Sequence, residues 1–126
     1  MARVGFAAVV YFALVFAAAF LLGVFRVTVL VPRFGALISV ALEVPVVLGL
    51  SWAVAGRVLR RWPMALGGRV AMGGMAFALL MAAEAGLAAV LFGQPLAGFL
   101  AAFATLPGAL GLAGQIGFAV IPALRL

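Results

Sequence analysis

The chain of 126 residues contains no cysteine, no histidine and no lysine, and its only acidic residues are two glutamates. Without cysteine and histidine there is no disulfide, no thiol or imidazole chemistry, and no metal site built from these ligands. Two carboxylates alone make a poor metal site, so we expect neither a metal nor a cofactor. Ser39 and Ser51 have no base to activate them as nucleophiles. We therefore expect no enzymatic activity.

Charge of both signs is scarce, because only 8% of the residues are charged while 70% are hydrophobic, and the mean hydropathy is +1.45. A soluble domain needs about 25% charged residues to cover its surface, so the solvent of this chain is expected to be largely lipid. The net charge of +6 comes from arginines at the ends of apolar stretches. There they orient a membrane protein and meet anionic headgroups, so nucleic-acid binding is not expected.

Four apolar stretches are long enough to cross a bilayer, which takes about 20 residues. They predict an all-α integral membrane four-helix bundle, one transmembrane domain over residues 1–126, with spans near 4–25, 34–58, 70–92 and 107–124. A signal peptide is the alternative for the first stretch, but its length favours a retained helix. Residues 96–104 are too short to span, so they predict a short interfacial helix. Alternatively, 96–124 forms one long kinked helix.

Three local features predict how these helices connect and pack. The segment Arg26–Arg33 is expected to form a turn at the membrane interface, with a break at Val31 because Pro32 disfavours helical geometry there. Pro45 lies well inside the second helix, where it removes one hydrogen bond and predicts a kink. In the third helix, small residues at intervals of four predict a face for close helix contact; they are Gly74, Ala78, Ala82 and Gly86.

The arginines also predict an orientation. With four spans, six of them share a side with the termini: Arg3, Arg57, Arg60, Arg61, Arg69 and Arg125. The opposite side holds only Arg26 and Arg33. The positive-inside rule then places both termini in the cytoplasm.

Three polar side chains inside the apolar stretches are predicted to reach one depth. At about 1.5 Å of rise per residue, Glu43, Glu84 and Gln115 each lie about 12–13 Å from the same membrane face. Ionisable residues inside membranes usually face the interior of a bundle and mark a functional pathway. Two such carboxylates could share a proton or bind a cation. Alternatively, Arg26 and Arg33 form ion pairs with them that fix helix packing, which the sequence favours.

The segment Arg26–Arg33, followed by Leu42-Glu43-Val44-Pro45, resembles a group of small bacterial inner-membrane proteins with four predicted spans. The resemblance extends over most of the chain, through residues 96–104 into the last helix. It implies the topology and the membrane, and it implies no biochemical activity.

Two functions are compatible with these features. The first is an accessory or structural subunit of a larger membrane assembly, because no segment outside the apolar stretches is large enough for a catalytic or receptor domain. Its partners would be the lipid bilayer and other membrane subunits or further copies of the chain. The second is a small proton- or cation-coupled transporter or channel, working as a homo-oligomer through Glu43 and Glu84. A water-filled path to these carboxylates would favour the second function, because a packing role does not require one.

Overall fold

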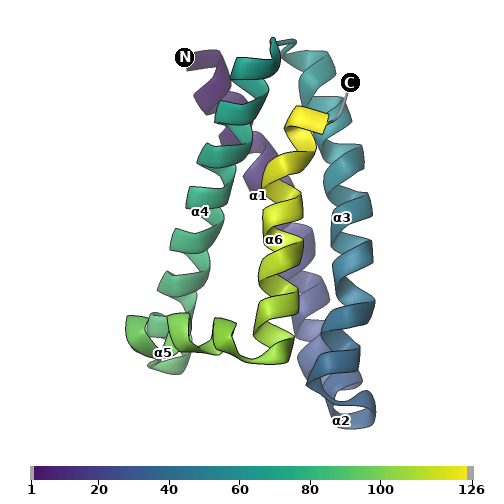
Figure 1. Cartoon of the computed structure of the whole chain (residues 1–126), viewed down its shortest axis with the longest axis vertical. Coiled ribbons are helices and arrows are strands. Elements are labelled where there is room, and N and C mark those ends of the chain that lie inside the picture. The colour runs from purple at the N-terminus through teal and green to yellow at the C-terminus, as the bar shows by residue number, and fades with distance from the viewer. Residues whose placement is uncertain (1, 125–126) are drawn as a thin grey trace.

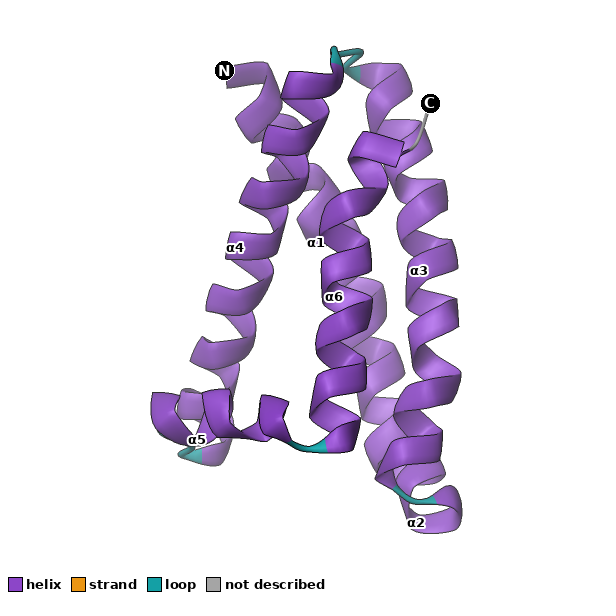
Figure 2. Ribbon diagram, viewed as in Figure 1, coloured by secondary structure: helices purple, strands orange, loops and turns teal. Residues whose placement is uncertain are grey.

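A computed structural model describes residues 2–124, and every regular element in this range is helical (Figure 2). The four long helices are α1 (Ala2–Phe25), α3 (Ala36–Arg61), α4 (Leu66–Phe92) and α6 (Leu106–Leu124). Shorter elements connect them: a π-helical segment η1 (Arg26–Leu30), α2 (Val31–Phe34), α5 (Leu96–Ala101) and the 3-10 turn η2 (Ala102–Ala104). The prediction of an all-α fold with four long apolar helices is confirmed. Arg125, which the charge count includes, lies outside the described residues.

The long helices form a bundle in which α1 packs against α3 and α4, and α6 packs against the same two helices. Helices α1 and α6 therefore lie on one diagonal, and α3 and α4 lie on the other. The N-terminus, the α3–α4 loop and the C-terminal end of α6 lie at one end, whereas α2 and α5 lie at the other (Figure 1). Four segments are long and apolar enough to cross a membrane: Arg3–Phe34, Ala36–Arg61, Leu66–Val90 and Leu106–Leu124.

The connection between the first two long helices differs from its prediction. The expected turn with a break at Val31 is wrong, because the chain stays helical to Phe34 and breaks at Gly35, whose φ is 84°. In η1 the N–H of Val31 donates to the carbonyl of Arg26, five residues back. This wider turn accommodates the ring of Pro32, which would otherwise clash with a carbonyl in the preceding α-turn. Arg26 consequently lies inside a continuous helical segment and not in a loop.

Helix α3 contains Pro45 and continues unbroken through it. Two buried serines of this helix donate their hydroxyl hydrogens to carbonyls one turn back: Ser39 to Gly35 at 2.6 Å, and Ser51 to Val47 at 2.7 Å. Such bonds satisfy a serine hydroxyl inside an apolar helix. The serines therefore have a structural role in α3.

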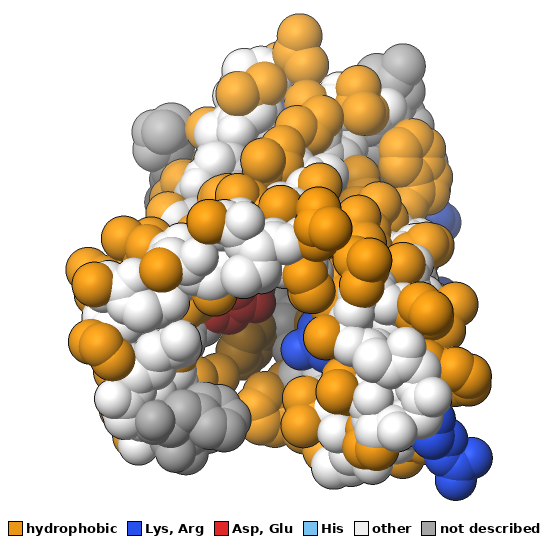
Figure 3. Space-filling view, turned by 60° about the horizontal axis from the view of Figure 1, so that its bottom comes forward, with side chains coloured by type: hydrophobic (Ala, Val, Ile, Leu, Met, Phe, Trp, Pro, Cys, Tyr) orange, Lys and Arg blue, Asp and Glu red, His pale blue; other side chains and the backbone are white. Residues whose placement is uncertain are grey.

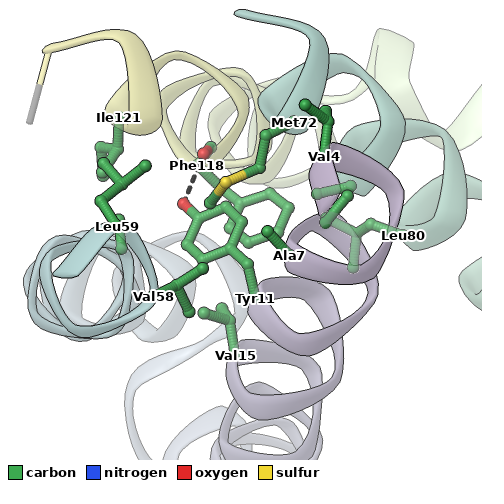
Figure 4. Packing of buried hydrophobic residues seen from close by; sticks show 13 residues of the cluster. Val4, Ala7, Tyr11, Val15, Val58, Leu59, Met72, Leu80, Phe118 and Ile121 are labelled. Atoms are coloured by element: carbon green, nitrogen blue, oxygen red, sulfur yellow. Dashed lines mark hydrogen bonds between the residues drawn. The ribbon is translucent and has the colours of Figure 1, made fainter. Parts of the chain in front are cut away.

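The buried core lies at the end of the bundle that holds both termini (Figure 4). At its centre Tyr11 stacks on Phe118 across the α1–α6 diagonal, with ring centroids 4.5 Å apart and planes inclined by 10°. The Tyr11 hydroxyl donates to the carbonyl oxygen of Phe118 at 2.6 Å. That carbonyl would normally accept the N–H of residue 122, which is Pro122 and has none. Tyr11 therefore satisfies a backbone acceptor that the proline leaves free.

Helices α4 and α6 approach closely at Gly73, where a Cβ atom would overlap the carbonyl oxygen of Ala119. The residues predicted to form the contact face of this helix, Gly74, Ala78, Ala82 and Gly86, are all exposed. That prediction is wrong for the single chain, because the stripe points away from the bundle. The neighbouring Gly73, which is buried, makes the close contact instead.

The short segment before α6 is separate from it, so the alternative of one long kinked helix over residues 96–124 is excluded. The chain leaves helical geometry at Thr105, with φ −81° and ψ 157°. The Thr105 hydroxyl oxygen accepts the N–H of Gly108 at 3.1 Å, in the manner of a helix N-cap. This cap fixes where α6 begins.

Candidate functional site

The opposite half of the bundle, away from the termini, contains a cavity of about 590 Å³. Most of its lining is apolar, but six polar side chains contribute: Arg26, Thr28, Glu43, Glu84, Gln94 and Gln115. Seen from the end where α2 and α5 lie, the surface is hollowed, with acidic and arginine side chains at the walls of the hollow (Figure 3). Three of the described lining residues are charged: Arg26, Glu43 and Glu84.

Arg26 and Glu43 form an ion pair across the first helical hairpin, with Nη1 of Arg26 2.9 Å from Oε2 of Glu43. Their side chains are 31% and 14% exposed, respectively. Arg26 is the charged partner of this oxygen among the described residues. The extension of the first helix to Phe34 explains the pairing. Gly35 reverses the chain, and the two residues lie nine and eight positions from it on antiparallel helices.

Glu84 has a neutral partner. The side-chain amide nitrogen of Gln115 on α6 donates a hydrogen bond to Oε2 of Glu84 on α4. The hydrogen bond fixes the orientation of the Gln115 amide. The other polar atom of this amide, the acceptor Oε1, is buried without a partner among the described residues. The second carboxylate of the chain is thus held in place by an amide, while no arginine forms an ion pair with it in the described part of the chain.

Of the residues that the sequence singles out, four line this one cavity: Arg26, Glu43, Glu84 and Gln115. Arg33 does not line it and lies exposed on α2, and Pro45 is exposed on α3. Two polar lining residues were not predicted, Thr28 and Gln94. Thr28 lies in the helical extension after Phe25, and Gln94 lies in the loop between α4 and α5. Only the extension of the first helix could have indicated Thr28. The Thr28 hydroxyl donates to the carbonyl of Val24 at 2.7 Å, which leaves it little capacity to donate to a ligand.

The cavity ends against the packed core. Val15, Leu80 and Phe118 line it and also belong to the buried cluster around Tyr11. The hollow therefore reaches from one end of the bundle to the middle, where close packing stops it.

This arrangement can attract a cation or hold a proton. In a region of low dielectric, Arg26 compensates one of the two carboxylates, and the other has only a hydrogen-bond donor. An ionised carboxylate in that position is costly unless it gains a proton or a positive partner.

Comparison of the chain with protein-family models, curated proteins and solved structures finds no match. The resemblance drawn from Arg26–Arg33 and Leu42–Pro45 stays a prediction.

Proposed function

We propose that this multi-pass membrane protein is a small carrier that exchanges protons or other cations through its cavity. The observation that supports the proposal is that Glu43 and Glu84, the two carboxylates of the chain, both line one hollow that opens at one end of the bundle. Ion pairs that serve packing alone do not need such a hollow, whereas a binding site inside a membrane does.

The two carboxylates have different roles in this proposal. Arg26 neutralises Glu43 and holds the hairpin of the first two long helices together. Glu84 has no cation of its own and is the group that binds and releases the transported ion. Since the core around Tyr11 closes the hollow, transport requires a conformational change that opens the other end, which is a carrier mechanism and not an open pore.

An accessory subunit is the second candidate, and the exposed stripe on α4 favours it. Gly74, Ala78, Ala82 and Gly86 leave a smooth outer face that suits a helix of another subunit or of a second copy in the bilayer. In that function the Arg26–Glu43 pair fixes packing and the cavity is incidental.

Both candidates share one setting, a bacterial inner membrane with the termini in the cytoplasm, and neither involves enzymatic chemistry. The described arginines support this orientation. Arg3, Arg57, Arg60, Arg61 and Arg69 lie toward the end of the bundle with the termini, while Arg26 is drawn into the cavity and leaves Arg33 alone at the other end. Helix-rich chains follow such a bias with the basic end inside the cell.

Proteoliposomes that contain a pH-sensitive dye test the carrier function. An outward proton gradient is imposed, and Na⁺, K⁺ and small organic cations are added outside one at a time. We expect at least one cation to raise the internal pH with the wild-type protein and to have no such effect with Glu84→Gln. Gly74→Ala, on the outer face of α4, is the matched control and should exchange normally. If no cation acts, or if Glu84→Gln exchanges like the wild type, the accessory function is favoured.

A further inference from the structure

We propose that the cavity binds an organic ammonium ion, with its N–H groups on Glu84 and Gln115 and its apolar body against the aromatic walls. This inference specifies the substrate class of the proposed carrier and so rests on that function. Such a ligand must match the cavity in charge, in hydrogen-bonding groups and in shape, and the described residues satisfy each of these conditions.

The charge of the lining favours a ligand with a single positive charge. Arg26, Glu43 and Glu84 are the charged groups that line the cavity, and Arg26 is paired with Glu43. When both carboxylates are ionised, the excess charge is one negative, located at Glu84. A monovalent cation neutralises it, whereas an anion would add to the excess negative charge of the lining.

The hydrogen-bonding groups near Glu84 favour a donor. The amide N–H₂ of Gln115 already donates to Glu84, and its Oε1 is buried with no partner. A carboxylate and an amide oxygen offer acceptors only, so a ligand that carries N–H groups can satisfy both. Leaving a buried acceptor such as Oε1 unpaired is unfavourable, and an ammonium that bonds it after a turn of the Gln115 amide removes that cost.

The shape and chemistry of the walls favour an organic body over a bare metal cation. The volume of about 590 Å³ lies within the range of small-molecule pockets, roughly 300–1,000 Å³. Phenylalanines from α1, α5 and α6 line it: Phe16, Phe20, Phe99 and Phe118. Aromatic faces attract cations and apolar groups together. Na⁺ or K⁺ would leave most of this apolar surface in contact with water.

The test is binding of a matched set of probes to the purified protein in mild detergent at neutral pH, measured by titration calorimetry. The probes share a phenyl ring and a short chain and differ at the end group: 2-phenylethylammonium, its N-trimethyl derivative, 2-phenylethanol and 3-phenylpropionate. We expect the primary ammonium to bind most tightly. The alcohol, which lacks the charge, should bind about tenfold more weakly or worse, as should the trimethyl derivative, which has no N–H group. The carboxylate should not bind.

Two variants examine the two halves of the site separately. Glu84→Gln keeps a hydrogen-bonding side chain but removes the charge, and it should weaken binding of the primary ammonium about tenfold or more. Ala19→Phe fills the cavity without changing a polar group, since Ala19 lines it, and should abolish binding even if Glu84→Gln fails to fold. Gly74→Ala should bind like the wild type.

Several outcomes would overturn the inference: no binding by any probe, equal binding of ammonium and alcohol, equal binding of the primary and trimethyl ions, or saturable binding of Na⁺ or K⁺ that excludes the ammonium. The binding assay does not depend on transport. Ammonium binding without ion exchange in liposomes would therefore reject the carrier and keep the site, whereas exchange of Na⁺ or K⁺ without ammonium binding would reject only the substrate class.

Discussion

The two halves of this bundle are built from the same four helices, but one is filled and the other is hollow. Toward the termini, large side chains such as Tyr11, Met72 and Phe118 are fully buried against one another. Toward α2 and α5, the same helices enclose about 590 Å³ with polar groups on the walls. Val15, Leu80 and Phe118 mark the boundary, since they belong to both regions.

The difference shows how polar groups are accommodated in each half. In the filled half the Tyr11 hydroxyl has one defined acceptor, the carbonyl that Pro122 leaves free. In the hollow half Gln115 Oε1 accepts no hydrogen bond from any donor in the described chain. The filled half thus stabilises the fold, and the hollow half holds groups that a ligand could satisfy. Substitutions in the two halves should consequently have different effects.

The largest loss of stability is expected for Gly73→Leu in the filled half. Any side chain there overlaps the backbone of Ala119, so α4 and α6 must separate, and we expect a cost of about 3 kcal/mol or more. Gly74→Leu is the matched control, because a Cβ there meets nothing within 4 Å, and its effect should stay within about 0.5 kcal/mol. Thermal unfolding in detergent measures both. Equal losses for the two variants would mean that this contact does not hold the filled half together.

A smaller loss is expected for Glu43→Gln, which removes the partner of Arg26. Breaking a fully buried pair costs about 3–5 kcal/mol, but these side chains are partly exposed to the cavity, so we expect about 2 kcal/mol. Glu84→Gln should cost about 1 kcal/mol or less, since its partner is a neutral amide and not a cation. Unfolding of the two variants under the same conditions tests the contrast. An unchanged melting temperature for Glu43→Gln would count against a stabilising ion pair.

Tyr11→Phe should cost about 1 kcal/mol, because it leaves the carbonyl of Phe118 without a donor while the ring stacking is retained. The loss should depend on Pro122. In a Pro122→Ala background the N–H of residue 122 can bond that carbonyl, so the same Tyr11→Phe change should then cost clearly less. A double-mutant cycle measures the coupling, and full additivity would contradict the assigned role of Tyr11.

Among the changes to the hollow half, the smallest effect on stability is expected for Ala19→Phe. Ala19 lines the cavity, so the larger side chain enters existing space, and the free energy of unfolding should change by less than about 1 kcal/mol. The melting temperature in detergent measures it. A loss as large as that of Gly73→Leu would show that the hollow half is packed as tightly as the filled one.

The lengths of the apolar stretches were enough to predict the four long helices. The polar residues within these stretches, Glu43, Glu84 and Gln115, were predicted to lie near one another, and all three line the cavity. What could not be predicted follows from tertiary geometry. The π-helical turn after Phe25 depends on the path of the chain to Gly35. If this turn is not foreseen, Arg26 is expected in a loop, and Arg33 is expected to pair with a glutamate as readily as Arg26. Likewise, Gly73 and Gly74 are adjacent and chemically identical, so only the position of α6 decides which of them is buried.

The hydrogen bond from Tyr11 to Phe118 also bears on the order in which the bundle can assemble. Its partners are 107 positions apart, on the first and fourth of the long helices. During synthesis the Arg26–Glu43 pair can form as soon as α3 is made, whereas the Tyr11–Phe118 and Gln115–Glu84 hydrogen bonds both wait for α6, which carries Phe118 and Gln115. The nascent chain therefore lacks both hydrogen bonds until its fourth long helix is made, and that helix completes the filled half and the hollow half in one step.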